Sequence, residues 1–225
     1  TREPEKIRRL ADICRRLPGV KPDATGNVTA LIAGIPNVGK STLINTLAGR
    51  PIAKAGNEPA VTKAQQRIDL RDGLVLIDSP GILWPKIDNA NSGYRLALSG
   101  AIKATAMQED DVAMFAAEYF LQAYPQLLRE RFRLEQLPDS AIELLETIGR
   151  QRGCLGSGGH VDFDRVATLL INEFRSATLG QISLETPAMA LAEEAQVQLL
   201  RDEKAAEKAA ADKARKQAFK EKRRH

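Results

Sequence analysis

The 225 residues are enough for one domain of ordinary size, or for one core with a small second unit. The formal net charge of +4 is unevenly distributed. Residues 201–225 hold ten Lys or Arg and five Asp or Glu, whereas residues 1–27 carry a net +3 and residues 28–200 a net −4. This pattern allows a polyanionic partner, but at the ends of the chain rather than at its middle.

Composition excludes several functional classes. Aromatic residues make up only 4% of the chain, so platforms for stacking bases are scarce. No apolar run approaches the roughly 20 residues of a membrane span, and the polar start at Thr1 does not resemble a secretory leader. Cys14 and Cys154 are too few for a disulfide framework or a paired-cysteine metal site. We expect a reducing, cytoplasmic location and no membrane partner.

The first half of the chain mixes helical and strand patterns. Apolar residues at helical spacing predict a helix over residues 3–17, which Pro18 ends. The apolar run at residues 28–34 is typical of a strand buried on both faces of a parallel sheet. A helix is then predicted over residues 40–48, closed by Gly49.

The pattern changes again after this helix. Residues 50–63 contain Pro, Gly and Asn without periodicity and predict a loop. Strands are predicted over residues 66–70 and 74–78, joined by the hairpin signal at residues 71–73.

Beyond about residue 90 the spacing of apolar residues is helical. Three such segments follow residues that can cap a helix: Asp110-Asp111, Asp139-Ser140 and Asp162. In the second segment, Ile142, Leu145 and Ile148 are expected to face the core. Residues 90–185 are thus expected to be all helical.

Residues 34–41, Gly-Ile-Pro-Asn-Val-Gly-Lys-Ser, match the phosphate-binding pattern GxxxxGK[ST]. Lys40 would neutralise the β- and γ-phosphates, the Ser41 hydroxyl would ligate Mg²⁺, and the start of the helix would add its dipole. A buried strand before the motif and a helix after it are the context that this loop requires. The residues expected to bind nucleotide are Asn37, Val38, Gly39, Lys40, Ser41, Thr42 and Gly81.

A second motif, Asp78-Ser79-Pro80-Gly81, begins at the end of the third predicted strand, residues 74–78. Asp78 would hold Mg²⁺ through water, and the Gly81 N–H would reach the γ-phosphate. Together with the phosphate loop, this motif predicts a GTPase-type enzyme. Thr62 lies in the loop predicted over residues 50–63, between the helix at 40–48 and the strand at 66–70. It is expected to complete the Mg²⁺ coordination beside Ser41 and Asp78. The candidate catalytic residues are Lys40, Thr62 and Gly81.

Three features depart from a typical GTPase. Ile82 stands where many GTPases place the glutamine that orients water, so intrinsic hydrolysis is expected to be slow. Asn37 is either a ligand for K⁺ or a turn former, and the residues leave both readings open. No Asn-Lys-x-Asp motif follows residue 82, so either guanine is not read in the usual way or its reading elements lie before residue 1.

Four segments together resemble the ribosome biogenesis GTPase A family of circularly permuted GTPases. They are Gly-Ile-Pro-Asn-Val-Gly-Lys-Ser-Thr-Leu-Ile-Asn (34–45), Asp-Ser-Pro-Gly-Ile-Leu-Trp-Pro-Lys (78–86), Arg-Leu-Ala…Gly-Ala-Ile-Lys (95–103) and Arg-Gly-Cys-Leu-x-Ser-Gly-Gly (152–159). The resemblance extends over about residues 1–187. It implies that guanine-reading motifs precede the phosphate loop and that this chain begins after the last of them. The family's catalytic histidine has no counterpart, because only His160 and His225 exist and neither matches its position.

The resemblance implies a GTP-hydrolysing switch protein that acts late in assembly of the large ribosomal subunit and binds rRNA through a helical domain. The expected fold class is α/β, a permuted P-loop GTPase-like sheet domain over residues 1–89, followed by a small all-α domain over residues 90–187. Residues 188–225, rich in Ala, Lys and Glu, are a basic tail that reads as a solvated helix or a disordered segment. Their charge either contacts rRNA or keeps a helix soluble.

The expected ligands are GTP or GDP and Mg²⁺, with K⁺ as a further candidate, and a monomer is expected. The arginines at residues 150–152 beside the glycine-rich loop either bind a phosphate backbone or belong to a helix end. The alternative function is a nucleotide-incompetent RNA-binding module.

Overall fold

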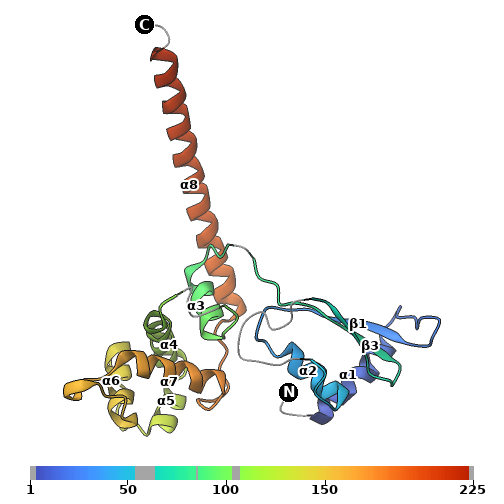
Figure 1. The fold of residues 1–225 in the computed structure, drawn as a ribbon. Coiled ribbons are helices and arrows are strands. Elements are labelled where there is room, and N and C mark those ends of the chain that lie inside the picture. The colour runs from blue at the N-terminus through green and yellow to red at the C-terminus, as the bar shows by residue number, and fades with distance from the viewer. Residues whose placement is uncertain (1–3, 54–63, 85, 103–106, 223–225) are drawn as a thin grey trace. The chain divides into compact units, whose positions relative to one another are not determined.

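The computed structural model describes residues 4–53, 64–84, 86–102 and 107–222. The chain divides into two compact units, the first formed by Thr1–Pro85 with Tyr94–Ile182 and the second by Lys86–Gly93 with Ser183–His225. Figure 1 shows the elements, which follow one another in the order α1 (Pro4–Arg16), β1 (Val28–Ile32), α2 (Lys40–Ala48), β2 (Gln66–Asp69), β3 (Leu74–Asp78), α3 (Ala90–Leu98), α4 (Glu109–Ala123), α5 (Pro125–Phe132), α6 (Ala141–Arg152), the 3₁₀ turn η2 (Ser157–Gly159), α7 (Phe163–Arg175) and α8 (Pro187–Lys222).

The three described strands form one sheet in the order β1-β3-β2. β1 and β3 are parallel, with Ile32 opposite Asp78, whereas β2 and β3 are antiparallel. The predicted hairpin is confirmed, and its turn uses left-handed backbone at Arg71 (φ 61°) and Gly73 (φ 84°). Arg15 of α1 forms an ion pair of 2.9 Å with Asp72 in this turn, so the turn is held against the first helix.

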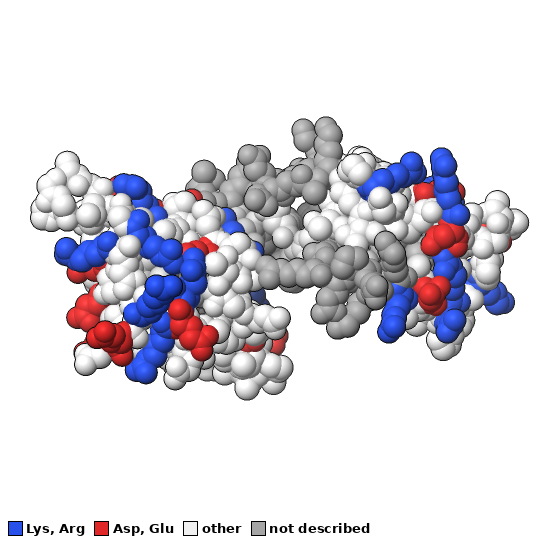
Figure 2. All heavy atoms as spheres, turned by 90° about the horizontal axis from the view of Figure 1, so that it is seen from below, with Lys and Arg blue, Asp and Glu red and all other residues white. Residues whose placement is uncertain are grey.

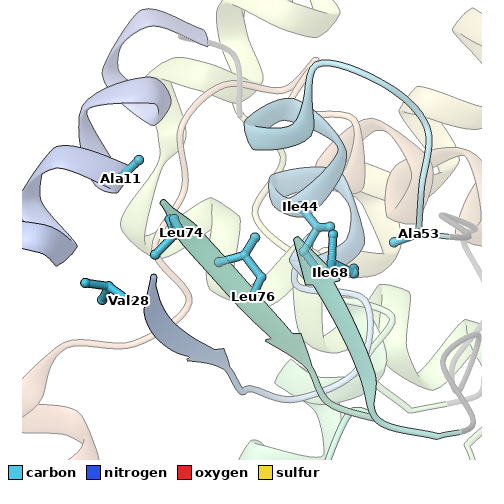
Figure 3. Close-up of a cluster of buried hydrophobic side chains, with 7 residues drawn as sticks. All are labelled: Ala11, Val28, Ile44, Ala53, Ile68, Leu74 and Leu76. Atoms are coloured by element: carbon cyan, nitrogen blue, oxygen red, sulfur yellow. The ribbon is translucent and has the colours of Figure 1, made fainter. Parts of the chain in front are cut away.

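One face of the sheet carries the core of this part of the molecule. Figure 3 shows side chains of β1, β2 and β3 pointing toward α2 and α1, the helices that cover this face. The buried cluster consists of Ala11, Val28, Ile44, Ala53, Ile68, Leu74 and Leu76. Each large apolar side chain removed from water in this way contributes about 1.5–3 kcal/mol before the cost of ordering it. This layer fixes the position of the loop between β1 and α2.

The prediction that the first strand is buried on both faces is wrong for the described chain. Leu31 of β1 is 61% exposed, and Thr29 is exposed as well. The strand buried on both faces is β3, where Leu74, Val75 and Leu76 are all at most 2% exposed. The reason is strand order: β3 lies between two neighbours, whereas β1 lies at the edge of the described sheet.

The helical part of the first unit packs α4, α6 and α7 together. The predicted N-caps at Ser140 and Asp162 are confirmed, since their side chains accept hydrogen bonds from the N–H groups of Glu143 and Arg165. The cap predicted at Asp110-Asp111 is wrong, because Gln108 is the N-cap and both acids lie in the first turn of α4. Acidic side chains in the first turn still stabilise the helix, because they interact favourably with the positive end of its dipole.

Of the three residues of α6 expected to face the core, Leu145 and Ile148 do so and Ile142 does not. Ile142 is 51% exposed, while Leu144, Leu145 and Ile148 are buried. α5 is a separate helix that the apolar spacing did not resolve. It begins at Pro125, whose fixed φ suits the first position of a helix.

The second unit is built on α8, so the helical alternative holds for residues 187–222. Asn89 and Asn91 donate to the two carboxylate oxygens of Glu193, at 2.7 and 3.1 Å. Arg201 donates to Asp88 at 3.1 Å. These contacts attach residues 86–93 to one face of the helix. Among the described residues, no helix combines the length and the apolar character that crossing a membrane requires.

Candidate nucleotide-binding site

The parallel strands β1 and β3 bring the two predicted motifs to one edge of the sheet. The phosphate loop follows β1, and Asp78 is the last residue of β3, directly opposite Ile32. The Ser79 hydroxyl donates to the Ile32 carbonyl at 2.8 Å, which ties the two strand ends together. Ligands of open α/β sheets bind outside the carboxyl ends of the strands, and both motifs lie at that end.

The backbone of the loop has the turns that phosphate binding needs. Asn37 (φ 58°) and Gly39 (φ 89°) are left-handed, whereas Val38 between them is not. Alternating hands of the backbone turn successive N–H groups toward one concave side, which suits an anion. Gly39 is the N-cap of α2 and, having no side chain, makes no capping hydrogen bond. The first N–H groups of this helix receive no bond from their N-cap residue and can therefore bind a ligand.

Lys40 folds back over the loop. Its ammonium donates to the carbonyls of Gly34 at 3.1 Å and Ile35 at 2.8 Å. Burial lowers the pKa of Lys40, and the Asp78 carboxylate opposes this effect. The ammonium thus lies at the mouth of the loop, near a buried carboxylate, where a phosphate oxygen could replace the two carbonyls.

Asp78 and Gly81 are held tightly at the same edge. Asp78 is only 1% exposed. A β-carbon on Gly81 would lie 2.7 Å from the backbone of Pro36, so no larger residue fits there without displacement. The Ile82 N–H donates to the Gly34 carbonyl at 3.2 Å, while the Ile82 side chain is 69% exposed. The segment after β3 therefore packs against the phosphate loop through its backbone.

The structure brings most of the predicted residues together and leaves some out. Ser41 is half-buried in the first turn of α2, Thr42 is exposed, and Val38 is 55% exposed. Asn37 adopts the left-handed turn, and its amide NH₂ donates to the Gly100 carbonyl at 2.7 Å. Thr62 and His225 lie outside the described residues.

Asn45 is a further candidate residue near the site, one that sequence reasoning did not single out. From the middle of α2, its side-chain oxygen accepts from the N–H groups of Ile52 and Ala53, and its NH₂ donates to the Ala53 carbonyl at 2.9 Å. These three bonds fix the start of the loop that leads toward Thr62. The sequence does carry a signal for this role. Asparagine is unfavourable in the interior of a helix, so its presence there suggests that its side chain bonds to backbone groups.

A second surface of interest lies at the ends of α5 and α6. Glu173, whose side chain is 12% exposed, accepts two hydrogen bonds from Arg131 at 2.6 and 2.7 Å and lies 3.5 Å from Arg152. Arg152 also lies over the Phe132 ring, 5.6 Å from its centroid. The exposed arginines nearby in sequence are Arg129, Arg133 and Arg150. We call Arg129, Arg131, Arg133, Arg150 and Arg152 the arginine surface. Figure 2 shows basic side chains gathered over the helical part.

Gly153, the first glycine beside this surface, belongs to a helix end. Gly153 is the C-cap of α6, with φ 69° and an N–H that donates to the carbonyls of Gly149 and Arg150. Here the left-handed backbone explains the glycine by itself. This supports the helix-end interpretation for Gly153 and leaves the arginines as candidate phosphate contacts.

Comparison with known proteins agrees with the motifs. The family described as 50S ribosome-binding GTPase matches residues 29–148. Ribosome biogenesis GTPase A of Priestia megaterium is 46% identical over 175 residues, which cover 78% of this chain and 60% of that protein. The protein of the same name from Bacillus cereus is 47% identical over 169 residues, covering 75% of this chain and 56% of its own length. The chain thus spans somewhat more than half of these relatives.

Two further relatives extend the comparison. GTPase grn1 of Schizosaccharomyces pombe is 33% identical over 71% of this chain and 37% of its own length. A solved structure described as GDP-bound TM YlqF has a TM-score of 0.50 and 28% identity, covering 72% of this chain and 62% of that one. The resemblance to ribosome biogenesis GTPase A and the P-loop GTPase fold are thereby confirmed. The chain belongs to the 50S ribosome-binding GTPase family.

Proposed function

We propose that this chain is the phosphate-binding and ribosome-contacting part of a GTP-hydrolysing switch protein that acts in late assembly of the large ribosomal subunit. The observation that carries the proposal is the meeting of Lys40, Asp78 and Gly81 at one edge of the sheet. The names of the relatives support a ribosome-related activity. A cytoplasmic monomer is part of the proposal.

Each residue has a distinct task in this proposal. Lys40 leaves its two loop carbonyls and binds the β- and γ-phosphates, while the N–H groups at the start of α2 bind their oxygens. Asn37, Val38, Gly39, Ser41 and Thr42 supply the rest of the loop. Gly81 presents its N–H to the γ-phosphate, and loss of that phosphate releases the segment that carries it.

The donor set at this edge fits a hard cation. Ser41 offers a hydroxyl and Asp78 a buried carboxylate, both oxygen ligands of the kind that Mg²⁺ takes. These residues, with Thr62, would hold Mg²⁺, which when bound neutralises charge on the phosphate oxygens. The side-chain oxygen of Asn37 is the candidate ligand for K⁺. The left-handed backbone at Asn37 equally supports its being a turn former.

Hydrolysis by this site is proposed to be slow without a partner. Ile82 has an apolar side chain that cannot orient water, and its N–H is used in the bond to Gly34. The group that activates water therefore comes from outside these residues, with the bound ribosomal particle as its proposed source.

The arginine surface is the proposed rRNA contact of the helical part. Glu173 holds two of its guanidinium groups in place, so they are ordered before RNA arrives. Arg129, Arg133 and Arg150 then add exposed positive charge at the ends of α5 and α6. Ordered arginines lose less entropy on binding phosphate than free ones.

The test is GTP hydrolysis by the full-length protein with and without large ribosomal subunits, at several K⁺ concentrations. A rate that rises on adding subunits is expected. A rate that stays unchanged at every K⁺ concentration contradicts the switch. The arginine surface also favours a second candidate, a nucleotide-incompetent RNA-binding module. For that candidate, GTP and ATP bind equally weakly while rRNA binding persists.

A further inference from the structure

The end of α3 is an ordered helix cap built around Gly100. The Gly100 N–H donates to the Ala97 carbonyl at 2.9 Å, and the Ala101 N–H donates to the Leu96 carbonyl at 2.8 Å. This pair of bonds, with Gly100 at φ 78°, is a Schellman motif. The motif fixes the direction of the peptide that carries the Gly100 carbonyl.

Arg175, from the last turn of α7, holds the same cap from the other side. Its guanidinium donates to the carbonyls of Leu98 at 2.9 Å and Ala97 at 2.7 Å. Burial lowers the pKa of Arg175, and Glu109 opposes this effect. A β-carbon on Gly100 would lie 3.3 Å from the guanidinium, so the glycine lets the arginine approach.

The Gly100 carbonyl meets the phosphate loop within the same compact unit. The Asn37 side-chain NH₂ donates to it at 2.7 Å in a half-buried position. A carbonyl is only an acceptor, so the amide of Asn37 must turn its nitrogen, not its oxygen, toward Gly100. The bond to the Gly100 carbonyl therefore favours the amide orientation in which the Asn37 nitrogen faces the end of α3.

We propose that Arg175 is a positioning residue for the phosphate loop: by holding the end of α3 it sets the Gly100 carbonyl, which in turn orients the Asn37 amide. A displacement of α7 would then change the loop without any direct contact between Arg175 and nucleotide. This goes beyond the proposed function, because it names the path by which an event on the helical part reaches the phosphate site.

The test measures the Asn37 side-chain amide itself. In the full-length protein without nucleotide, its hydrogen exchange is followed by NMR, with the signal assigned by its loss in Asn37→Ser. In Arg175→Ala the exchange is expected to be about fivefold faster, the factor that corresponds to one net hydrogen bond of about 1 kcal/mol. Arg175→Lys, which restores one donor, is expected to recover part of the protection.

The matched control is Arg165→Ala. Arg165 belongs to the same helix and also donates to a backbone carbonyl, that of Leu155 at 3.1 Å, but not to α3. It should leave the Asn37 exchange rate unchanged. Equal acceleration in both variants, or none in Arg175→Ala, overturns the proposal.

A second variant covers the case in which Arg175→Ala does not fold. Gly100→Ala keeps the arginine but forces a β-carbon against it at a left-handed φ, so it should also release Asn37. An unchanged Asn37 signal in this variant contradicts the positioning. Because no nucleotide is present, the result is independent of whether the protein hydrolyses GTP.

Discussion

Gly81 lies against Pro36 so closely that a β-carbon on the glycine would stand 2.7 Å from the Cα, N and Cγ atoms of the proline. The requirement for glycine here comes from this approach and not from a left-handed backbone. Pro36 is in the phosphate loop and Gly81 follows β3, so the two predicted motifs are in direct contact. Movement of the segment after β3 toward the phosphate loop would therefore displace Pro36.

Gly81→Ala is expected to force the two motifs apart. Overpacking of this kind costs about 1–3 kcal/mol, and affinity for a GTP analogue should fall more than affinity for GDP. Titration with fluorescent nucleotides measures both. Gly156→Ala is the control, because its φ is −89° and its β-carbon would meet only the His160 carbonyl, at 3.9 Å. Equal losses for the two nucleotides would argue against contact between Gly81 and the γ-phosphate.

Lys40→Met is expected to abolish tight nucleotide binding with little effect on folding. The ammonium is partly desolvated and bonds only to loop carbonyls among its hydrogen-bond contacts in the described structure, whereas its charged bonds to phosphate are worth about 1.5–3 kcal/mol each. Nucleotide titration and urea unfolding separate the two effects. Lys86→Met, at a lysine with an 84% exposed side chain, is the control. A large drop in unfolding free energy for the Lys40 variant would show that the lysine is mainly structural.

Asn45→Ala is expected to destabilise the protein by about 1–3 kcal/mol, because it leaves half-buried backbone groups at Ile52 and Ala53 without their partner. Asn45→Asp keeps the oxygen that accepts from both N–H groups but places an acceptor-only oxygen against the Ala53 carbonyl, so it should recover only part of the lost stability. Urea denaturation of the three proteins measures the difference. If the alanine variant is as stable as the unchanged protein, the clamp on the loop is not what these bonds provide.

Replacing Arg129, Arg133 and Arg150 by alanine is expected to weaken rRNA binding and to reduce its salt dependence. The slope of log affinity against log salt becomes shallower by about 0.7–0.9 for every phosphate that an arginine no longer neutralises. Filter binding at several salt concentrations gives this slope. Replacing Arg9, Arg50 and Arg67, which are also exposed, removes the same charge from the sheet part and is the control. If the two triple variants have equal slopes, the change in salt dependence comes from net charge alone and the arginine surface is not the rRNA contact.

The local patterns were enough to predict the phosphate loop, the helix at Lys40–Ala48, the hairpin after it and the caps at Ser140 and Asp162. These features depend on residues close together in the chain, such as a glycine beside a helix start or a serine before an apolar stripe. The motifs also identified the family. The predicted domain boundaries at residues 89 and 187 and the roles of the site residues stay predictions.

Other features were decided only where distant segments meet. An apolar run does not reveal whether its strand will have neighbours on both sides, so β3 rather than β1 is the buried one. Gly81 is needed because Pro36 approaches it, and Asn37 is oriented because α3 ends beside it. The side chains proposed to bind phosphate could be named from the chain, but the contacts that hold them in place come from tertiary packing, because they join residues far apart in the sequence.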